Sequence, residues 1–518
     1  MLQILRIAIL AVPAVCLFAQ SGGAGALTPQ AASRFLEQAT WGPRPQDVLH
    51  LQQAGFANWL AEQFAAAPSP IPDPLASEKG IKSLQSAFFL NAINAPDQLR
   101  QRVAFALSEI WVVSALQENE SIWITPYWRL LLQDAFGNYR GLMNDMTLDP
   151  GMGRYLNMVN NDQADAAKGT TPNENYGREL MQLFTLGVNL LNPDGSLQKD
   201  SSGQPIPTYA QTDVVTMSRA FTGWTYPPGA GQKTPQSAGR HNPAYWVGAM
   251  AANEANHDTG EKTLLNGVQA AAGQTAEADL KAALDSIFNH PNIGPFISQQ
   301  LIQHLVSSDP SPQYVARVAA VFANDGAGVR GNLQAVVQAI LLDPEARAGD
   351  DPSQVNPGGG HLREPMLFLT TIYRMLGAST TNGSTGSQLP AGLGQPLFYE
   401  PSVFSYFSPQ YRVPGVGLPA PEFQLHSAAT AIARANLATA LVNGHKDKST
   451  TFDFSPYLAA AGNPSQIVAL LNQTMLHGTM SSGLSDALSA VLGSRPGSAQ
   501  VKNAIALVAA SPEFSIEK

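Results

Sequence analysis

Apolar residues recur at intervals of three and four along most of this chain, which is the spacing of one face of an α-helix. The clearest case is the stretch 97–114, where Leu99, Val103, Leu107 and Ile110 fall on one face. Helices are expected over 31–38, 54–64, 97–114, 128–136, 139–147, 211–221, 276–289, 292–306, 312–323, 331–342 and 363–377. The pattern therefore predicts a mainly α, multi-helical globular protein.

Three stretches interrupt the helical pattern. Residues 188–208 carry two turn signals, Asn192-Pro193-Asp194-Gly195 and Ser201-Ser202-Gly203, between short strand-like runs. This arrangement predicts a small β-hairpin insertion. Residues 225–262 and 378–421 are rich in proline with glycine or aromatic residues and predict long ordered loops. A loop such as 225–262 is more often functional than passive, whereas the aromatic stretch 398–414 is interpreted as a loop held by its own rings, with a binding groove as the alternative.

The best candidate for a domain boundary is the segment 347–360, which ends in Pro357-Gly358-Gly359-Gly360. Its composition is typical of a linker, and a chain of 518 residues is long enough for more than one domain. We therefore expect an N-terminal helical domain over 27–346, which contains the candidate polar site, and a C-terminal helical region over 361–518 that packs on it.

The N-terminus has the pattern of an export signal over residues 1–26. Arg6 is its only charge and an apolar run follows, with small residues that allow cleavage after Ala19 or Ala26. The alternatives are a lipid anchor on Cys16 and a buried N-terminal helix. The chain has one cysteine, so a mature chain without the signal would have no disulfide and no thiol catalysis. No later apolar run has transmembrane length, and we expect a periplasmic or extracellular protein.

Composition narrows the classes of partner. Hydrophobic residues make up 44% of the chain and charged residues only 13%, with a net charge of -9. The apolar content is sufficient for a large core. The negative balance argues against a nucleic-acid partner, whose phosphates attract basic proteins, and against electrostatic docking to anionic lipid.

A dense group of polar residues stands at 173–180 in this charge-poor chain. The candidates in it are Asn173, Glu174, Asn175, Arg178 and Glu179. Carboxylates beside a guanidinium suit acid–base catalysis and the binding of a polar or anionic substrate. The alternative is structural: Glu174 completes a capping box with Thr171 at a helix start whose first residue is Pro172, and it pairs with Arg178 one turn later.

A second polar group stands at 257–262, where His257 and Asp258 precede Lys262. An imidazole held by a carboxylate serves acid–base chemistry or metal binding. The alternative is a turn closed by local hydrogen bonds. Three further candidates for substrate binding lie on or just after the helix 211–221: Asp213, Arg219 and Trp224. Their structural alternatives are an acid favoured by the helix dipole, an ordinary ion pair and a core aromatic residue.

Six stretches of the chain resemble a single family. They are 39–48, 97–114, 173–188, 210–224, 257–265 and 393–415. Together they are similar to the bacterial family known as domain of unknown function 1800, over nearly the whole mature chain. The resemblance implies an exported protein of unestablished activity, whose gene tends to neighbour one for a protein related to alkaline phosphatases and sulfatases. Some relatives carry His where this chain has Phe184 and Thr where it has Ala210, which weakens any metal site built on position 184.

Two functional hypotheses follow. The first is a hydrolase or transferase that acts on an extracellular polymer in a pocket formed by 173–179, 213–224 and 257–262. Glu174 or Glu179 would act as acid or base, Arg178 and Lys262 would hold substrate charge, and Asp258 would orient His257. The second is a non-catalytic binding or assembly protein of the cell envelope that works with the phosphatase- or sulfatase-like partner. The sequence holds no G-x-S-x-G, Walker or H-E-x-x-H motif, and it leaves cofactor and metal open.

Overall fold

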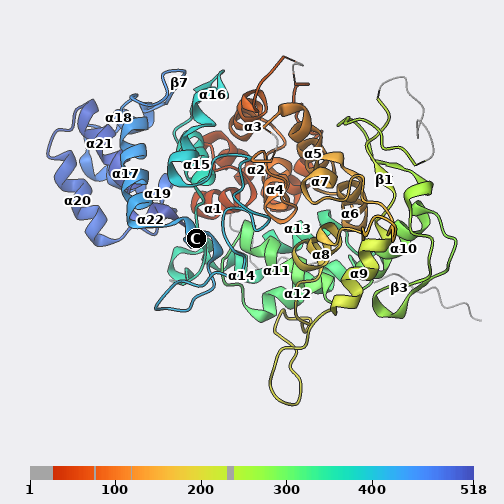
Figure 1. Cartoon of the computed structure of the whole chain (residues 1–518). Helices are drawn as coiled ribbons and strands as arrows, with labels where there is room; N and C mark the ends of the chain where they lie inside the picture. Colours follow the sequence, from red (N-terminus) through yellow and green to blue (C-terminus); the bar gives the residue numbers. More distant parts are fainter. Residues whose placement is uncertain (1–26, 75–76, 118, 230–238, 357) are drawn as a thin grey trace, which may run out of the picture.

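The computed structural model describes residues 27–74, 77–117, 119–229, 239–356 and 358–518. The predicted signal segment, residues 1–26, lies outside the described residues. Within the described ranges the chain forms 22 α-helices and eight strands of two residues each. The predicted mainly α fold is confirmed (Figure 1).

The first half of the chain is built from helices that are joined by short connections up to residue 155. The helices are α1 (Pro29–Ala39), α2 (Pro45–Ala65), α3 (Lys82–Asn94), α4 (Gln98–Ile110), α5 (Ser121–Asp134), α6 (Tyr139–Leu148), α7 (Pro150–Tyr155), α8 (Asn175–Glu179), the π-helix η1 (Leu180–Thr185) and α9 (Gln211–Ala220). Then come η2 (Glu254–Asn256), η3 (Leu265–Gly267), α10 (Ala276–Phe288), α11 (Ile293–Leu305), α12 (Pro312–Ala323), α13 (Leu333–Leu342) and α14 (Pro344–Arg347).

The rest of the chain is helical as well. Its elements are η4 (Ala348–Asp350), η5 (Pro352–Gln354), α15 (Pro365–Met375), α16 (Gly383–Gly386), η6 (Leu389–Leu393), η7 (Pro421–Leu425), α17 (Ala428–Val442), α18 (Ser455–Ala459), α19 (Pro464–Met475), α20 (Ser482–Leu492), α21 (Ser498–Ala509) and α22 (Pro512–Ser515). Helices α17–α22 form one end of the molecule, and α9 and α10 lie at the other (Figure 1).

The strands form four separate antiparallel pairs. These pairs are β1 (Trp224–Thr225) with β2 (Ala251–Ala252), β3 (Lys262–Thr263) with β4 (Gln269–Ala270), β5 (His361–Leu362) with β8 (Ile516–Glu517), and β6 (Ser379–Thr380) with β7 (Thr450–Thr451). In the β5–β8 pair, His361 lies opposite Glu517. This pairing ties the end of the chain to the segment that precedes α15.

Many helices begin with the same local chemistry. Ser311 accepts a hydrogen bond from the Tyr314 amide at 3.1 Å, and Pro312 is the first helical residue of α12. A side-chain oxygen of this kind satisfies an amide that has no partner within the helix, and proline fixes a helical φ angle where its missing N–H is not needed. Thr28 with Pro29, and Asn463 with Pro464, start α1 and α19 in the same way.

Helix α4 lies at the centre of the fold (Figure 1). Every residue from Gln98 to Ile110 is buried, and the helix packs against α2, α3, α5 and α11. The apolar face predicted from the sequence, with Leu99, Val103 and Leu107, belongs to the main hydrophobic core. Because the remaining faces are buried too, the polar side chains of α4 must find partners or cavities inside the protein.

The predicted β-hairpin insertion at 188–208 is present as paired backbone. The Leu190 amide donates to the Ile206 carbonyl at 2.8 Å, and the Gln198 amide donates to the Leu190 carbonyl at 2.8 Å. Its bridges are isolated, so it forms no named strand. The segment is the yellow loop that projects below α12 in Figure 1.

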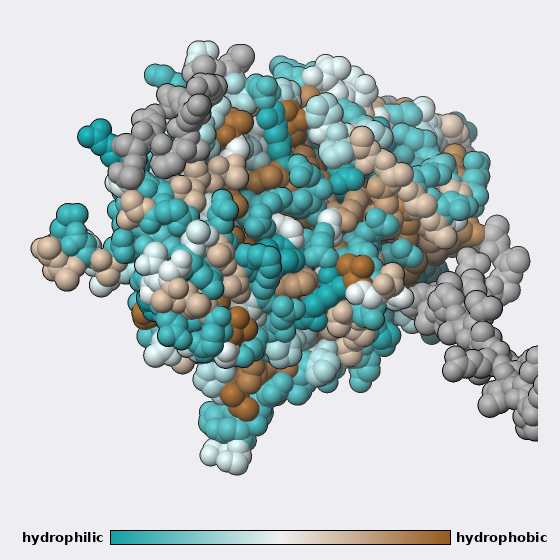
Figure 2. Space-filling view, turned by 90° about the vertical axis from the view of Figure 1, so that its right-hand side faces the viewer, coloured by the Kyte–Doolittle hydropathy of each residue, from teal (hydrophilic) through white to brown (hydrophobic). Residues whose placement is uncertain are grey.

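The surface matches the low charge of the chain. Figure 2 shows the side that carries α10, where apolar residues form small patches among hydrophilic ones. Among the described residues, no helix combines the length and apolar character needed to cross a membrane.

Candidate functional site: a buried carboxylate–histidine centre

The polar group predicted at 173–180 lies between α8 and the start of α9. Arg178 contacts Glu174 at 2.6 Å, and Gln211 on α9 donates to the same carboxylate at 2.8 Å. Glu174 and Arg178 are each about one-third exposed, at 34% and 37%. The predicted pair one turn apart is confirmed. The predicted helix start at Thr171 is wrong, because α8 begins at Asn175 and Glu174 makes no capping bond; its carboxylate is engaged by Arg178 and Gln211 instead.

Asn173 and Asn175 shape the turn before α8. Asn173 donates its amide to the Asn161 side chain at 2.7 Å, and its own side chain accepts from the Asn175 amide at 2.9 Å. Asp213 accepts from the Ala210 amide at 2.7 Å and so caps the start of α9. These contacts are structural, and the predicted binding role of the three residues stays a prediction.

Glu179 differs from its neighbours because one of its oxygens has no fixed donor. It is the last residue of α8, directly before the π-helix η1, and its buried Oε2 atom makes no hydrogen bond. Burial raises the pKa of Glu179, against the opposing effect of Arg178. Phe184 on η1 is fully buried and its ring lies 4.7 Å from that of Trp111, so position 184 belongs to the core.

The polar group predicted at 257–262 is a closed network, which we call the α9 network: Arg219, His257, Asp258, Lys262 and Asp279. Arg219 donates two hydrogen bonds to Asp258, at 2.8 and 3.0 Å. His257 Nε2 lies 3.0 Å and Lys262 Nζ 2.6 Å from the same oxygen of Asp279. Asp279 was not predicted from the sequence.

Burial and charge pairing hold the α9 network together. The side chains of His257, Lys262 and Asp279 are at most 1% exposed. Burial opposes ionisation of Asp279, but the contacts with His257 and Lys262 outweigh it and lower its pKa. Gly223 permits the close approach of this loop: its φ is +81°, and a Cβ atom there would lie 2.8 Å from His257 Cβ.

Helix α9 separates the two predicted groups. Gln211 at its first residue contacts Glu174, and Arg219 near its end contacts Asp258. Eight residues of α-helix rise by about 12 Å. The structure therefore brings the predicted residues together as two ion-pair groups at the two ends of α9. Trp224 is buried on β1, beyond this helix, and lines a groove of about 630 Å³ with Arg140 and Lys281.

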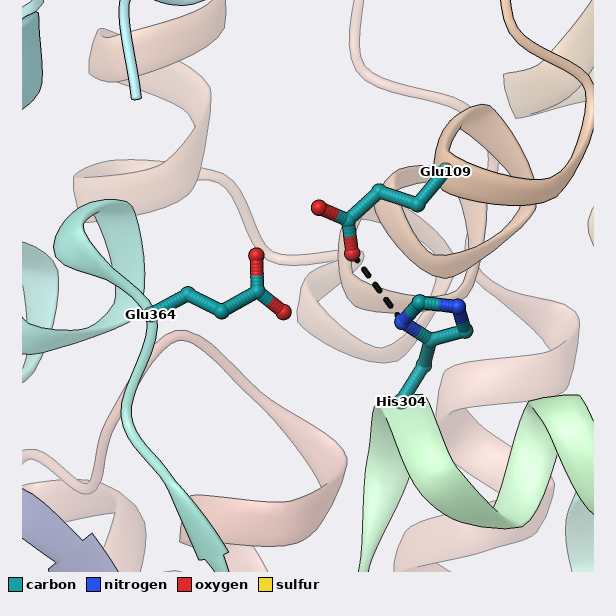
Figure 3. Close-up of side chains that lie close together, drawn as sticks. All are labelled: Glu109, His304 and Glu364. Atoms are coloured by element: carbon teal, nitrogen blue, oxygen red, sulfur yellow. Dashed lines mark ion pairs between the residues drawn. The ribbon is translucent and has the colours of Figure 1, made fainter. Parts of the chain in front are cut away.

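A third cluster, which the sequence did not reveal, lies at the heart of the fold. We call Glu109, His304 and Glu364 the acid–histidine centre. They come from α4, from the last turn of α11 and from the residue just before α15. One ligand-type atom from each lies within 4.8 Å of the others. Figure 3 shows the two carboxylates and the imidazole turned toward a common point.

Neighbouring side chains hold this centre in place. Gln395 donates to Glu364 at 2.5 Å and to Glu109 at 3.3 Å, while its own oxygen accepts from the Met366 amide at 2.9 Å. Arg102 is fully buried and donates to the His304 carbonyl, which leaves its Nε and one terminal nitrogen without partners. The amide therefore orients both carboxylates at once, and the guanidinium supplies a nearby positive charge.

A small cavity opens beside the acid–histidine centre. It has a volume of about 20 Å³ and is lined by Gln300, Gln303, His304, His361, Glu364, Phe407, Pro409, Pro421 and Glu422. A cavity needs roughly 10–15 Å³ to hold one water molecule. The cavity therefore admits one water-sized species next to His304 and Glu364. Phe407 covers the imidazole of His304, with the ring centroids 6.2 Å apart.

Burial dominates the electrostatics of the centre. It raises the pKa of Glu109 to about 7 and that of Glu400 to about 8, and it raises the pKa of Glu364 well above its usual value. It also lowers the pKa of His304 to about 4. A hydrogen bond between the carboxyl groups of Glu109 and Glu364 raises the pKa of Glu364 further. Burial therefore favours the uncharged form of all three side chains.

The sequence held one usable signal for this centre. Arg102 and Glu109 are seven residues apart, so they lie on one side of a helix whose apolar face carries Leu99, Val103 and Ile110. Such ionisable residues in a core helix indicate an internal polar site. His304 and Glu364 gave no comparable signal, because the surface of α11 and the start of α15 are places where polar residues are ordinary.

The fold and the site define a mainly α-helical protein with a buried carboxylate–histidine centre. The chain belongs to the family described as Protein of unknown function (DUF1800), whose profile matches residues 34–516. No curated protein and no solved structure matches the chain at a significant level. The family places no activity on these residues, so function has to be argued from the site.

Proposed function

We propose that this protein is an exported enzyme, a hydrolase or transferase acting on an extracellular polymer, and that its chemistry takes place at the acid–histidine centre. One observation carries the proposal: two carboxylates and an imidazole from three distant segments converge, and two of these groups, Glu364 and His304, line a cavity that admits one water-sized species. These are the groups that move protons or activate water in enzymes. Export is supported by the charged and apolar pattern of residues 1–26.

The acid–histidine centre is favoured as the active site over the residues around α9, because one of its carboxylate oxygens makes no hydrogen bond to another side chain. Glu109 Oε2 is buried and accepts no hydrogen bond from a fixed donor. In the α9 network, by contrast, Asp258 and Asp279 are engaged by Arg219, His257 and Lys262. Catalytic roles for Glu174, Arg178, Glu179, His257 and Asp258 stay predictions.

A screen of chromogenic esters, phosphate esters and glycosides tests the proposal. Glu364→Gln keeps the shape of the side chain, and we expect it to lower turnover by about 100-fold or more, the range for loss of one acid–base group. The matched control is Asp134→Asn, since Asp134 also has a buried oxygen without a partner and a pKa raised to about 7 by burial. It should keep full turnover.

The same screen separates the two candidate sites. If the double variant Glu174→Gln/Glu179→Gln abolishes turnover while Glu364→Gln does not, the active site lies at α8 and our assignment is wrong. If the wild-type protein turns over none of the three substrate classes, the enzymatic proposal fails.

The small size of the cavity favours a second candidate function. A volume of about 20 Å³ does not admit a sugar ring or a side chain, so catalysis on a polymer requires lining residues such as Phe407 and Pro409 to move aside. Binding of a large partner on the outer surface requires no such movement. The groove of about 630 Å³ beside Trp224 offers such a surface. In this candidate the protein is a non-catalytic binding or assembly protein that works with a phosphatase- or sulfatase-like partner. Co-purification of the two proteins at a fixed ratio, without turnover, would support it.

A further inference from the structure

We infer that Glu109, His304 and Glu364 bind one divalent transition-metal ion, with zinc and manganese as the fitting ions. The inference rests on the proposed function, which makes this centre the active site, and it adds a metal cofactor to that site. Each residue contributes one ligand atom: a carboxylate oxygen from each glutamate and Nδ1 from the histidine. The ion would lie at the point toward which the three side chains turn in Figure 3.

The distances suit a metal ion with a small adjustment. Ligand atoms bound at about 2.1 Å lie roughly 3.4 Å apart in a tetrahedral site and at most about 4.2 Å apart across an octahedral site. Glu109 Oε2 lies 3.1 Å from His304 Nδ1, and all three ligand atoms lie within 4.8 Å of one another. A pair of ligand atoms at the 4.8 Å limit has to close by roughly 0.6 Å for an octahedral site and by roughly 1.4 Å for a tetrahedral site, and side-chain rotation supplies such a shift.

An unpartnered atom points to the same ligand. The Glu109 side chain is 2% exposed, and its Oε2 atom accepts no hydrogen bond from a fixed donor. The contact of this oxygen with His304 lacks hydrogen-bond geometry, although the two atoms are only 3.1 Å apart. Two polar atoms held side by side without hydrogen-bond geometry are an arrangement that a cation bound to both can complete.

Charge leads to the same conclusion. Glu109 and Glu364 are both buried within reach of each other, and two ionised carboxylates in such a place need compensating positive charge. Arg102 is the nearby cation, but it donates to the His304 carbonyl rather than to either carboxylate. A divalent ion bound to both carboxylates supplies this positive charge.

The surroundings have the features of a supported metal site. Ligands in metalloproteins are held by outer hydrogen bonds, and here Gln395 bonds to both carboxylates. The cavity beside His304 and Glu364 has room for one water molecule. Three protein ligands with one water position are the pattern of a catalytic site, whereas structural zinc sites have four protein ligands.

The ligand set selects the class of ion. Magnesium and calcium bind through oxygen ligands, and magnesium keeps several of its waters. An imidazole nitrogen favours zinc, iron or other transition metals, and carboxylates are also suited to manganese. A site with one nitrogen and two carboxylates therefore fits zinc or manganese better than magnesium or calcium.

Calorimetric titration of the chelator-treated protein with zinc chloride, and separately with manganese chloride, tests the inference. We expect one ion per chain. Glu364→Gln and His304→Gln should weaken binding by more than about 100-fold, beyond the range for loss of an outer-sphere contact. Asp134→Asn is the matched control and should bind as the wild type does. Circular dichroism of each variant confirms that it is folded.

A second measurement uses the wild-type protein alone and does not depend on any variant. Pulsed electron paramagnetic resonance of the manganese form should show coupling to one imidazole nitrogen. Absence of binding at millimolar metal, equal affinity in folded Glu364→Gln and His304→Gln, or a manganese spectrum without nitrogen would each overturn the inference.

The metal inference and the proposed function fail in different ways. If turnover survives complete metal removal but is lost in Glu364→Gln, the proposed enzymatic function stands and the metal inference is wrong. If the protein binds the metal tightly but turns over no substrate, the metal inference stands and the proposed enzymatic function is wrong.

Discussion

His304 places its Nδ1 atom 3.1 Å from Glu109 Oε2 without forming a hydrogen bond. The two residues come from helices α11 and α4, which pack against each other in the core, so the contact is fixed by the packing of two rigid elements. A cation bound to both atoms, at one side of the line that joins them, would account for this close approach of two polar atoms that do not bond to each other.

Phe407 controls access to the acid–histidine centre. It covers the His304 imidazole and lines the cavity, and an apolar wall of this kind limits solvent entry to a metal site. Phe407→Ala should speed removal of the bound ion by a chelator by about 10-fold or more, as measured by stopped-flow with a metal-sensitive dye. Phe404→Ala is the control on the same loop, because Phe404 is 41% exposed and does not line the cavity. Equal rates for the two variants would contradict the role of Phe407.

The α9 network should matter for stability much more than the pair at α8. Lys262→Met leaves Asp279 buried without its ammonium partner, and breaking a buried pair on one side costs about 3–5 kcal/mol in the free energy of unfolding. Arg178→Met removes a pair whose side chains are about one-third exposed, and it should cost less than about 1 kcal/mol. Urea titration of both variants measures the difference. Similar losses for the two variants would mean that the α9 network is not a buried structural unit.

Asp149 should make stability depend on pH. Burial raises the pKa of its carboxyl group to about 7 in the folded protein, compared with about 3.9 in an unfolded chain. The folded protein therefore holds a proton that the unfolded chain has lost, and the stabilisation present below pH 4 disappears as the pH rises to 7.

The variant Asp149→Asn isolates this effect. In the wild-type protein the Met152 amide donates a hydrogen bond to Asp149 at 2.8 Å. Asparagine keeps an oxygen that accepts this bond, but its side chain does not titrate. Between pH 5 and pH 8, we expect the wild-type protein to lose about 1–3 kcal/mol more unfolding free energy than the variant does. Urea titrations at the two pH values measure this difference, and parallel pH profiles would show that Asp149 ionises normally.

Glycine is required where α16 packs on α3. A Cβ atom added at Gly383 would lie 2.2 Å from the Ser86 carbonyl oxygen, which is backbone and cannot move aside easily. Gly383→Ala should destabilise the protein by about 1–3 kcal/mol, as overpacking does. The control is Gly392→Ala, because a Cβ atom at Gly392 meets nothing within 4 Å. Thermal unfolding of both variants tests whether this contact joins the C-terminal part of the chain to the N-terminal part; equal melting temperatures would contradict it.

The features of the fold that could be predicted from the sequence are those that depend on the residues of one short segment. The apolar spacing in 97–114 gave the core helix α4, and the turn signals at 188–208 gave the hairpin. Ion pairs between near neighbours, such as Glu174 with Arg178, could also be predicted, because helical spacing brings the two side chains together. The predicted start of α8 was wrong, and the Glu174 carboxylate binds Gln211, which is distant in sequence, instead of forming a capping box.

The acid–histidine centre was beyond local pattern. Its three residues come from α4, α11 and the segment before α15, and only the packing of those elements brings them together. Asp279 was missed for the same reason, since α10 delivers it to His257 and Lys262 from outside the 257–262 motif. The clusters of polar residues that stand out in the sequence lie at capping and ion-pair positions in the structure. The acid–histidine centre instead contains single buried acidic residues that are far apart in the sequence.

The most direct test of the central claim is an anomalous difference map from crystals grown with manganese. We predict one strong peak between Glu109, His304 and Glu364, within about 2.0–2.3 Å of a ligand atom from each residue. A map that shows no peak in the acid–histidine centre, while the side chains are well defined, would contradict the account.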